Sequence, residues 1–125
     1  MDEKKLILYV DDEDMNLMLF EEIFSEWFNV ITAESGFSGI EKLKQNPDIK
    51  SVISDMKMPL MNGLEFISKA RTNFPNKEYF ILTGFDIDQK ISEALNQKII
   101  IKYFQKPLNV NDILESLIDC EPDIF

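Results

Sequence analysis

Histidine is absent from this 125-residue chain, and cysteine occurs only once, as Cys120. Without histidine, the chain has no His-based catalytic triad, no histidine zinc ligand and no phosphohistidine of its own. A lone cysteine forms no internal disulfide and no thiolate metal cluster, and an unpaired thiol is typical of a reducing cytoplasm. No apolar run reaches the roughly 18 residues that a membrane span needs, and no export signal is visible. These absences favour a cytoplasmic protein without a membrane segment.

Basic residues are also few: 13 lysines and arginines stand against 23 acids, which gives a formal net charge of −10. Such a surface repels phosphate backbones, so we expect no nucleic-acid binding by this domain. The chain has only four glycines and five prolines, and 45% of its residues are apolar, which excludes disordered and low-complexity sequence. A chain of this length has room for one domain with one hydrophobic core, and we expect that domain to span residues 1–125.

Short apolar runs alternate along the chain with segments of helical spacing. The runs are rich in branched and aromatic residues, as in a parallel sheet that is covered on both faces. Strands are expected at Lys5–Val10, Asn29–Ala33, Lys50–Ser54, Glu78–Thr83 and Ile99–Phe104. Five strands that alternate with five helices predict a doubly wound α/β fold with a five-stranded parallel sheet. Right-handed crossovers leave few strand orders, and we expect the flavodoxin-like order 2-1-3-4-5, which is one of two common ones.

Polar residues mark where the helices begin. Asn62, with Glu65 three residues later, has the spacing of a capping box. Further N-caps are expected at Asn109, at Asp14, and at either Asp86 or Asp88. The second helix, roughly Gly36 to Gln45, has the weakest signal because its two glycines lower the helical propensity.

Chemically active side chains follow several strands at the sheet edge where open α/β folds bind ligands. They are Asp11, Asp12 and Glu13 after the first strand, Asp55 after the third, Thr83 at the fourth, where Gly84 follows, and Lys106 after the fifth. Three carboxylates held close together repel one another, so at least one pKa should rise unless a cation lies between them. Oxygen ligands without histidine or cysteine select a hard cation, Mg²⁺ or Mn²⁺ before Zn²⁺. Asp55, alone at the end of a central strand, is best placed to form an aspartyl phosphate.

These motifs, taken together, resemble the receiver domain of two-component response regulators. The matching residues are Val10–Glu13, Asp55–Gly63 with the pattern D-x-x-M-P-x-M-N-G, Thr83–Gly84, Tyr103 and Lys106–Pro107. The resemblance covers essentially the whole chain, and the D-x-x-M-P-x-M-N-G segment is its most specific part. It implies a signalling switch that phosphorylation activates, with no turnover of an external substrate.

The resemblance also implies a role for each matching position. Asp55 would accept a phosphoryl group from a phosphohistidine on a partner, either a sensor histidine kinase or a histidine phosphotransfer protein. Asp12 would bind Mg²⁺ directly and Asp11 largely through water. The backbone carbonyl of Lys57 would be a further ligand. Lys106 would pair with Asp55 and then with the phosphoryl oxygens.

The response to phosphorylation is implied in the same way. Thr83 would hydrogen-bond the phosphoryl group beside the backbone N–H of Gly84, and the ring of Tyr103 would move inward as Thr83 shifts. An unidentified downstream protein would read the change on the fourth helix, fifth strand and fifth helix. The Lys106–Pro107 peptide bond is expected to be cis.

Lys57 and Phe85 stand where related domains often carry polar groups that orient the hydrolytic water. We therefore expect slow loss of the phosphoryl group. Self-association through exposed apolar residues of the first helix stays open as a route to a homodimer.

Three other classes of protein share parts of this pattern. A phosphatase of the haloacid-dehalogenase type also uses a strand-end aspartate, but its D-x-D motif is not met, because Asp11, Asp12 and Asp14 read D-D-x-D. A flavodoxin-like electron carrier needs a Thr-, Ser- and Gly-rich loop after the first strand, where these acids would repel an FMN phosphate. A receiver that is never phosphorylated is disfavoured by the complete set of matching residues.

Overall fold

The computed structural model describes residues 4–84 and 88–119, so the predictions for Phe85, Asp86 and Cys120 lie outside the described residues. Within these ranges the predicted alternation of strands and helices is confirmed. The elements are β1 (Lys5–Val10), α1 (Asp14–Phe24), β2 (Phe28–Ala33), α2 (Gly36–Gln45), β3 (Ser51–Asp55), α3 (Gly63–Asn73), β4 (Glu78–Thr83), α4 (Gln89–Asn96), β5 (Lys102–Gln105) and α5 (Val110–Asp119). The strands form one parallel sheet in the predicted order, β2-β1-β3-β4-β5.

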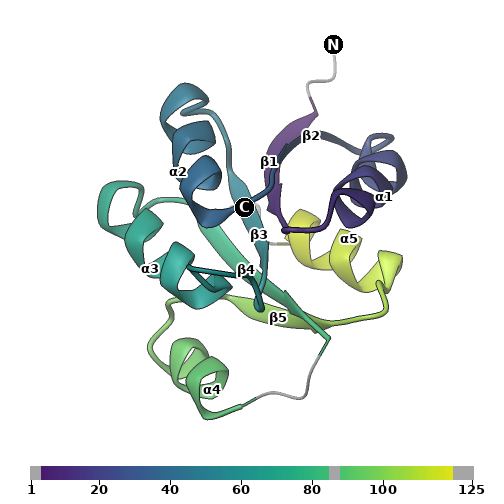
Figure 1. Ribbon diagram of the computed structural model, residues 1–125. Helices are drawn as coiled ribbons and strands as arrows, with labels where there is room; N and C mark the ends of the chain where they lie inside the picture. Colours follow the sequence, from purple (N-terminus) through teal and green to yellow (C-terminus); the bar gives the residue numbers. More distant parts are fainter. Residues whose placement is uncertain (1–3, 85–87, 120–125) are drawn as a thin grey trace, which may run out of the picture.

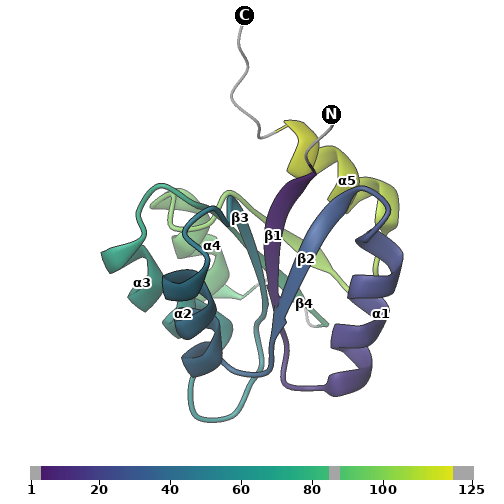
Figure 2. The same cartoon turned by 90° about the horizontal axis from the view of Figure 1, so that it is seen from above.

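Helices cover both faces of the sheet, with α1 and α5 on one side and α2, α3 and α4 on the other (Figure 1, Figure 2). Each face has its own hydrophobic core because successive strand residues point to opposite faces. Leu8 of β1 packs in the core that includes Phe66 of α3, whereas Tyr9 packs in the core that includes Phe20 and Ile113. Among the described residues, no helix is long and apolar enough to cross a membrane.

The helix starts mostly follow the predicted caps. Asn62 and Glu65 form the expected capping box of α3, Asn109 accepts the Asp112 N–H at α5, and Asp88 accepts the Ile91 N–H at α4. The helix with the weakest sequence signal, α2, has the predicted bounds. It is capped by Ser35 and Ser38, whose side chains and backbone N–H groups bond reciprocally. This box offsets the low helical propensity of the glycines.

The prediction of Asp14 as the first cap is wrong. Asp14 is already helical, and the N-cap position belongs to Glu13, whose side chain makes no capping hydrogen bond. The Glu13 N–H instead donates to the carboxylate of Asp11. Asp14 therefore places its negative charge in the first turn, where it favours the positive end of the helix dipole.

The fifth strand begins at Lys102, not at Ile99 as predicted. The preceding residues end α4 with a Schellman motif, in which the N–H groups of Lys98 and Ile99 bond to the carbonyls of Leu95 and Ala94 at 3.1 and 2.8 Å. Lys98 supplies the left-handed residue, with φ of 60°. The apolar run therefore closes α4 and places Ile100 in the core, and the first bond to β4 comes from the Ile101 N–H, which donates to the carbonyl of Tyr79 at 2.9 Å.

Candidate functional site

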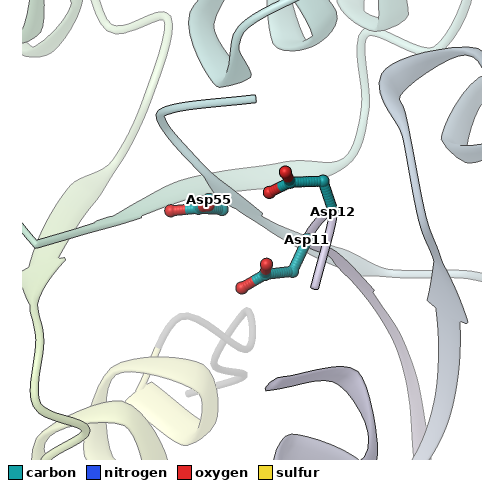
Figure 3. Close-up of side chains that lie close together, drawn as sticks. All are labelled: Asp11, Asp12 and Asp55. Carbon is teal, nitrogen blue, oxygen red and sulfur yellow. The ribbon is translucent and has the colours of Figure 1, made fainter. Parts of the chain in front are cut away.

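Three aspartates converge at the carboxyl edge of the sheet. Asp11 and Asp12 follow β1 directly, and Asp55 is the last residue of β3, the strand that pairs with β1. One carboxylate oxygen from each residue belongs to a group of atoms that all lie within 4.8 Å of one another. Figure 3 shows the three side chains directed toward a common space. The parallel pairing of two adjacent strands thus brings together acids that are more than 40 residues apart in sequence.

Burial differs sharply among the three carboxylates. Asp11 is fully buried, Asp55 is 7% exposed, and Asp12 lies at the surface. Burial, reinforced by the charge of Asp11, raises the pKa of Asp55 to about 6, although Lys106 acts in the opposite direction. The expected rise of a carboxylate pKa is therefore confirmed. The site has a closed floor and an open side toward solvent.

Lys106 joins this group from the loop after β5. Its Nζ lies 3.3 Å from Oδ1 of Asp55 and 3.6 Å from Oδ2 of Asp11. The backbone N–H of Lys106 donates to the carbonyl of Thr83 at 2.8 Å, which fixes the loop against the end of β4. The Lys106–Pro107 peptide bond is cis, as expected. A single ammonium group therefore faces two of the three carboxylates.

Thr83 and Tyr103 lie on the adjacent strands β4 and β5. Thr83 is the last residue of β4 and is 1% exposed. Tyr103 is half-buried, pairs in register with Ile81 and packs against the core beneath α3 and α4. Gly84 and Lys57 are exposed, Lys57 on the loop that follows Asp55. Phe85 is outside the described residues, so its expected effect on phosphoryl loss stays a sequence-based prediction.

Gly63 at the start of α3 explains the glycine of the D-x-x-M-P-x-M-N-G segment. Its N–H donates to the carbonyl of Met56 at 2.8 Å, which closes the loop after β3. A Cβ at this position would overlap the backbone oxygen of Asp55 and lie 2.9 Å from Cδ1 of Ile81. The close approach of α3 to β3 therefore requires a residue without a side chain.

Two residues that sequence reasoning missed hold Asp11 in place. The hydroxyl of Tyr9 donates to Oδ2 of Asp11 at 2.6 Å, and the amide of Asn16 donates to the same oxygen at 3.2 Å. Tyr9 looked like one more apolar residue of β1. The strand period of two, which places residues 9 and 11 on one face, was the available signal.

Comparison with known proteins identifies the family of this chain. The model of the response regulator receiver domain family matches residues 7–118. The sporulation initiation phosphotransferase F of Bacillus subtilis is 29% identical, over 94% of this chain and 92% of its own length. A response regulator receiver domain protein of Methanospirillum hungatei is 28% identical, with a TM-score of 0.83 over 93% of this chain and 92% of that one.

Some relatives are much longer than this chain. The hydrogenase transcriptional regulatory protein HoxA of Bradyrhizobium diazoefficiens is 26% identical over 89% of this chain, which spans 23% of that protein. The chain belongs to the response regulator receiver domain family. It is a signalling module of the kind that phosphorylation regulates.

Proposed function

We propose that residues 1–125 form one receiver domain in which Asp55 accepts a phosphoryl group from a phosphohistidine on a partner, in a reaction that depends on Mg²⁺. The partner is a sensor histidine kinase or a histidine phosphotransfer protein, and no external substrate is turned over. The observation that carries the proposal is the convergence of Asp11, Asp12, Asp55 and Lys106 on one edge of the sheet. Helix capping does not account for three acids and a lysine gathered in this way.

The residues present fit a hard divalent cation. The three grouped ligands are carboxylates, without histidine or cysteine, and oxygen ligands of this kind suit Mg²⁺ or Mn²⁺. Asp12 and Asp55 would hold the ion directly, with the backbone carbonyl of Lys57, and Asp11 would hold it largely through water. When bound, the cation would neutralise the crowded carboxylates and the negative charge of the incoming phosphoryl group.

The chain's own residues then carry out the transfer. An oxygen of Asp55 attacks the phosphorus and forms an acyl–phosphate bond, while the phosphorus–nitrogen bond of the donor breaks and its electron pair returns to the imidazole. Lys106, which already contacts Asp55, moves with the charge and pairs with the phosphoryl oxygens. Catalysis by this set is positioning and charge stabilisation, as in other phosphoryl transfers.

Thr83 and Tyr103 would carry the signal away from Asp55. Thr83 would hydrogen-bond the phosphoryl group beside the Gly84 N–H, and Tyr103 would turn inward. A cleft of about 580 Å³ supports a readout surface here, since it is lined by Leu95 of α4, by β5 including Tyr103, and by Asp112 of α5. Moving such a two-state switch from 1:99 to 99:1 needs roughly 5.5 kcal/mol, which a phosphoryl dianion with three acceptor oxygens can largely supply.

A downstream protein would read this surface. Self-association is a further prediction, for which α1 presents exposed apolar side chains at Met15, Met18 and Leu19.

Intact mass spectrometry tests the proposal. The protein is incubated with acetyl phosphate in Mg²⁺ and, separately, in excess chelator. We expect the mass of one phosphoryl group to appear in wild type and in Asp48→Asn, an exposed acid before β3, but only with Mg²⁺. Asp55→Asn should stay unmodified. Equal modification of Asp55→Asn, or equal modification without divalent cation, would contradict the proposal.

A further inference from the structure

Tyr9 places a phenol hydroxyl directly beneath the carboxylate cluster. Its side chain is 2% exposed, and its ring stacks on Phe20 with 4.1 Å between centroids and 10° between planes. The hydroxyl donates to Oδ2 of Asp11 at 2.6 Å, within the range of short hydrogen bonds to a charged acceptor. The packed ring therefore fixes where this hydroxyl points, and so where it holds the carboxylate.

The hydrogen bonds to Asp11 leave little of its carboxylate available. A carboxylate offers about four lone-pair sites. On Oδ2, one site accepts from Tyr9 and one from Asn16, and Nζ of Lys106 lies 3.6 Å from the same oxygen. On Oδ1, one accepts from the Glu13 N–H at 3.0 Å. One site on Oδ1 is left, so Asp11 can offer a cation, or a water bound to it, a single oxygen.

We propose that Tyr9, assisted by Asn16, is a positioning residue that restricts Asp11 to one-oxygen binding and thereby selects Mg²⁺ over Ca²⁺. Mg²⁺ takes six ligands in near-ideal octahedral geometry, keeps several waters and uses one or two carboxylates. Ca²⁺ takes six to eight oxygens and commonly binds a carboxylate through both of its oxygens. This inference rests on the proposed cation site of Asp11, Asp12 and Asp55.

Tyr9→Phe tests the inference because it removes the hydroxyl and keeps the ring that stacks on Phe20. The structure offers a matched control in Tyr79→Phe. Tyr79 is also 2% exposed, and its hydroxyl donates to the carbonyl of Phe74 at 2.7 Å. Both variants lose one buried hydroxyl and one hydrogen bond, but only Tyr9 contacts the acids.

Isothermal titration calorimetry on the metal-stripped full chain measures binding of Mg²⁺ and of Ca²⁺ separately. In Tyr9→Phe we expect the ratio of Mg²⁺ to Ca²⁺ affinity to fall about tenfold, the low end of the usual effect of removing an outer partner of a metal ligand. Asn16→Ala, a change at a half-buried helix position, should lower the ratio in the same direction. Tyr79→Phe should keep the wild-type ratio within about twofold.

The outcomes separate this inference from the proposed function. An unchanged ratio in Tyr9→Phe and in Asn16→Ala would overturn the role of Tyr9 while phosphorylation of the wild type on Asp55 still stood. An equal loss of both cations would show a structural effect only and would also overturn it. If Tyr9→Phe does not fold by circular dichroism, Asn16→Ala decides. A wild type that binds no Mg²⁺ would contradict both proposals.

Discussion

Nζ of Lys106 lies 3.3 Å from Oδ1 of Asp55, so the ammonium group already faces the carboxylate that is proposed to react. The Lys106 side chain is 30% exposed, whereas that of Asp55 is 10% exposed. The lysine therefore bridges the closed floor of the site and its open side. From that position it can contact the phosphoryl group of an approaching donor before, during and after the transfer.

Replacing Lys106 should slow phosphorylation without abolishing it. The Lys106→Met variant loses one preorganised cation at the transferred group, and the loss of one such donor typically costs about a hundredfold or more in rate. We expect the initial rate of modification by acetyl phosphate, followed by intact mass, to fall by about that factor. Lys102→Met, at the start of the preceding strand β5 and paired with Asp112, should react like wild type. A rate for Lys106→Met within about threefold of wild type would contradict the assigned role.

Removing the charge of Asp55 should stabilise the metal-free protein in a pH-dependent way. The pKa of Asp55 is raised from 3.8 to about 6, first by burial and then by Asp11. Between these values the folded state keeps a proton that the unfolded chain has lost, so wild-type stability falls as the pH rises. For Asp55→Asn, we expect a gain in the free energy of unfolding of about 3 kcal/mol near pH 7.5 and about half of that near pH 5.

Urea denaturation in excess chelator measures this gain. Asp48→Asn removes an exposed carboxylate before the opposite end of β3, is the matched charge removal and should change stability little at either pH. Saturating Mg²⁺ should narrow the gap between wild type and Asp55→Asn, because the cation binds the folded wild type. A gain that is equal at the two pH values would show that burial and repulsion at Asp55 are not its source.

Two glycines near the site should differ in their tolerance of a methyl group. In Gly63→Ala the new Cβ overlaps the backbone oxygen of Asp55, so β3 or α3 must shift. In Gly84→Ala the nearest atom is Cδ of Lys106 at 3.9 Å, an ordinary contact. We expect Gly63→Ala to lose about 2 kcal/mol of stability and most of its phosphorylation rate, while Gly84→Ala folds normally. Equal thermal melting temperatures for the two variants would refute this assignment.

Lys5 should matter more for stability than the better-exposed ion pair of Lys102. The Lys5 side chain is 8% exposed and donates to Glu78 at 2.9 Å and to the carbonyl of Leu117 at 2.8 Å, which ties β1 to β4 and α5. Lys5→Met leaves the Glu78 carboxylate without this partner and should cost about 3 kcal/mol. Lys102 and Asp112 are 45% and 41% exposed, so Lys102→Met should cost at most about 1 kcal/mol. Urea unfolding of both variants checks the difference.

Apolar periodicity and strand-end chemistry predicted the parallel sheet and the residues that converge on its edge, and narrowed its strand order to two common ones. Those features follow from backbone geometry, because the carboxyl ends of parallel strands lie at the same edge of the sheet. The two predictions that were wrong, the Asp14 cap and the start of β5, depend on which of several nearby groups forms a hydrogen bond. The N-cap position of α1 falls on Glu13, whose N–H donates to the Asp11 carboxylate, and the carbonyl of Ala94 accepts the Ile99 N–H that a longer β5 would use.

The contacts of single side chains were the least predictable from sequence. Ser35 and Ser38 cap α2 with two small hydroxyls, where the familiar pattern has glutamate or glutamine at the later position. Tyr9 combines an apolar ring for the core with a hydroxyl for Asp11. The strand period of two places Tyr9 and Asp11 on one face, but the ring contact with Phe20 becomes visible only when α1 has been placed against β1.

Mapping the phosphorylated residue tests the central claim most directly. Borohydride reduces an aspartyl phosphate to homoserine, which tandem mass spectrometry of the digested protein then locates. After reaction with acetyl phosphate and Mg²⁺, the account predicts homoserine at position 55 in the wild type and at no other aspartate. Reduction at Asp11 or Asp12 instead, or none at position 55 in a protein that carries the added mass, would contradict it.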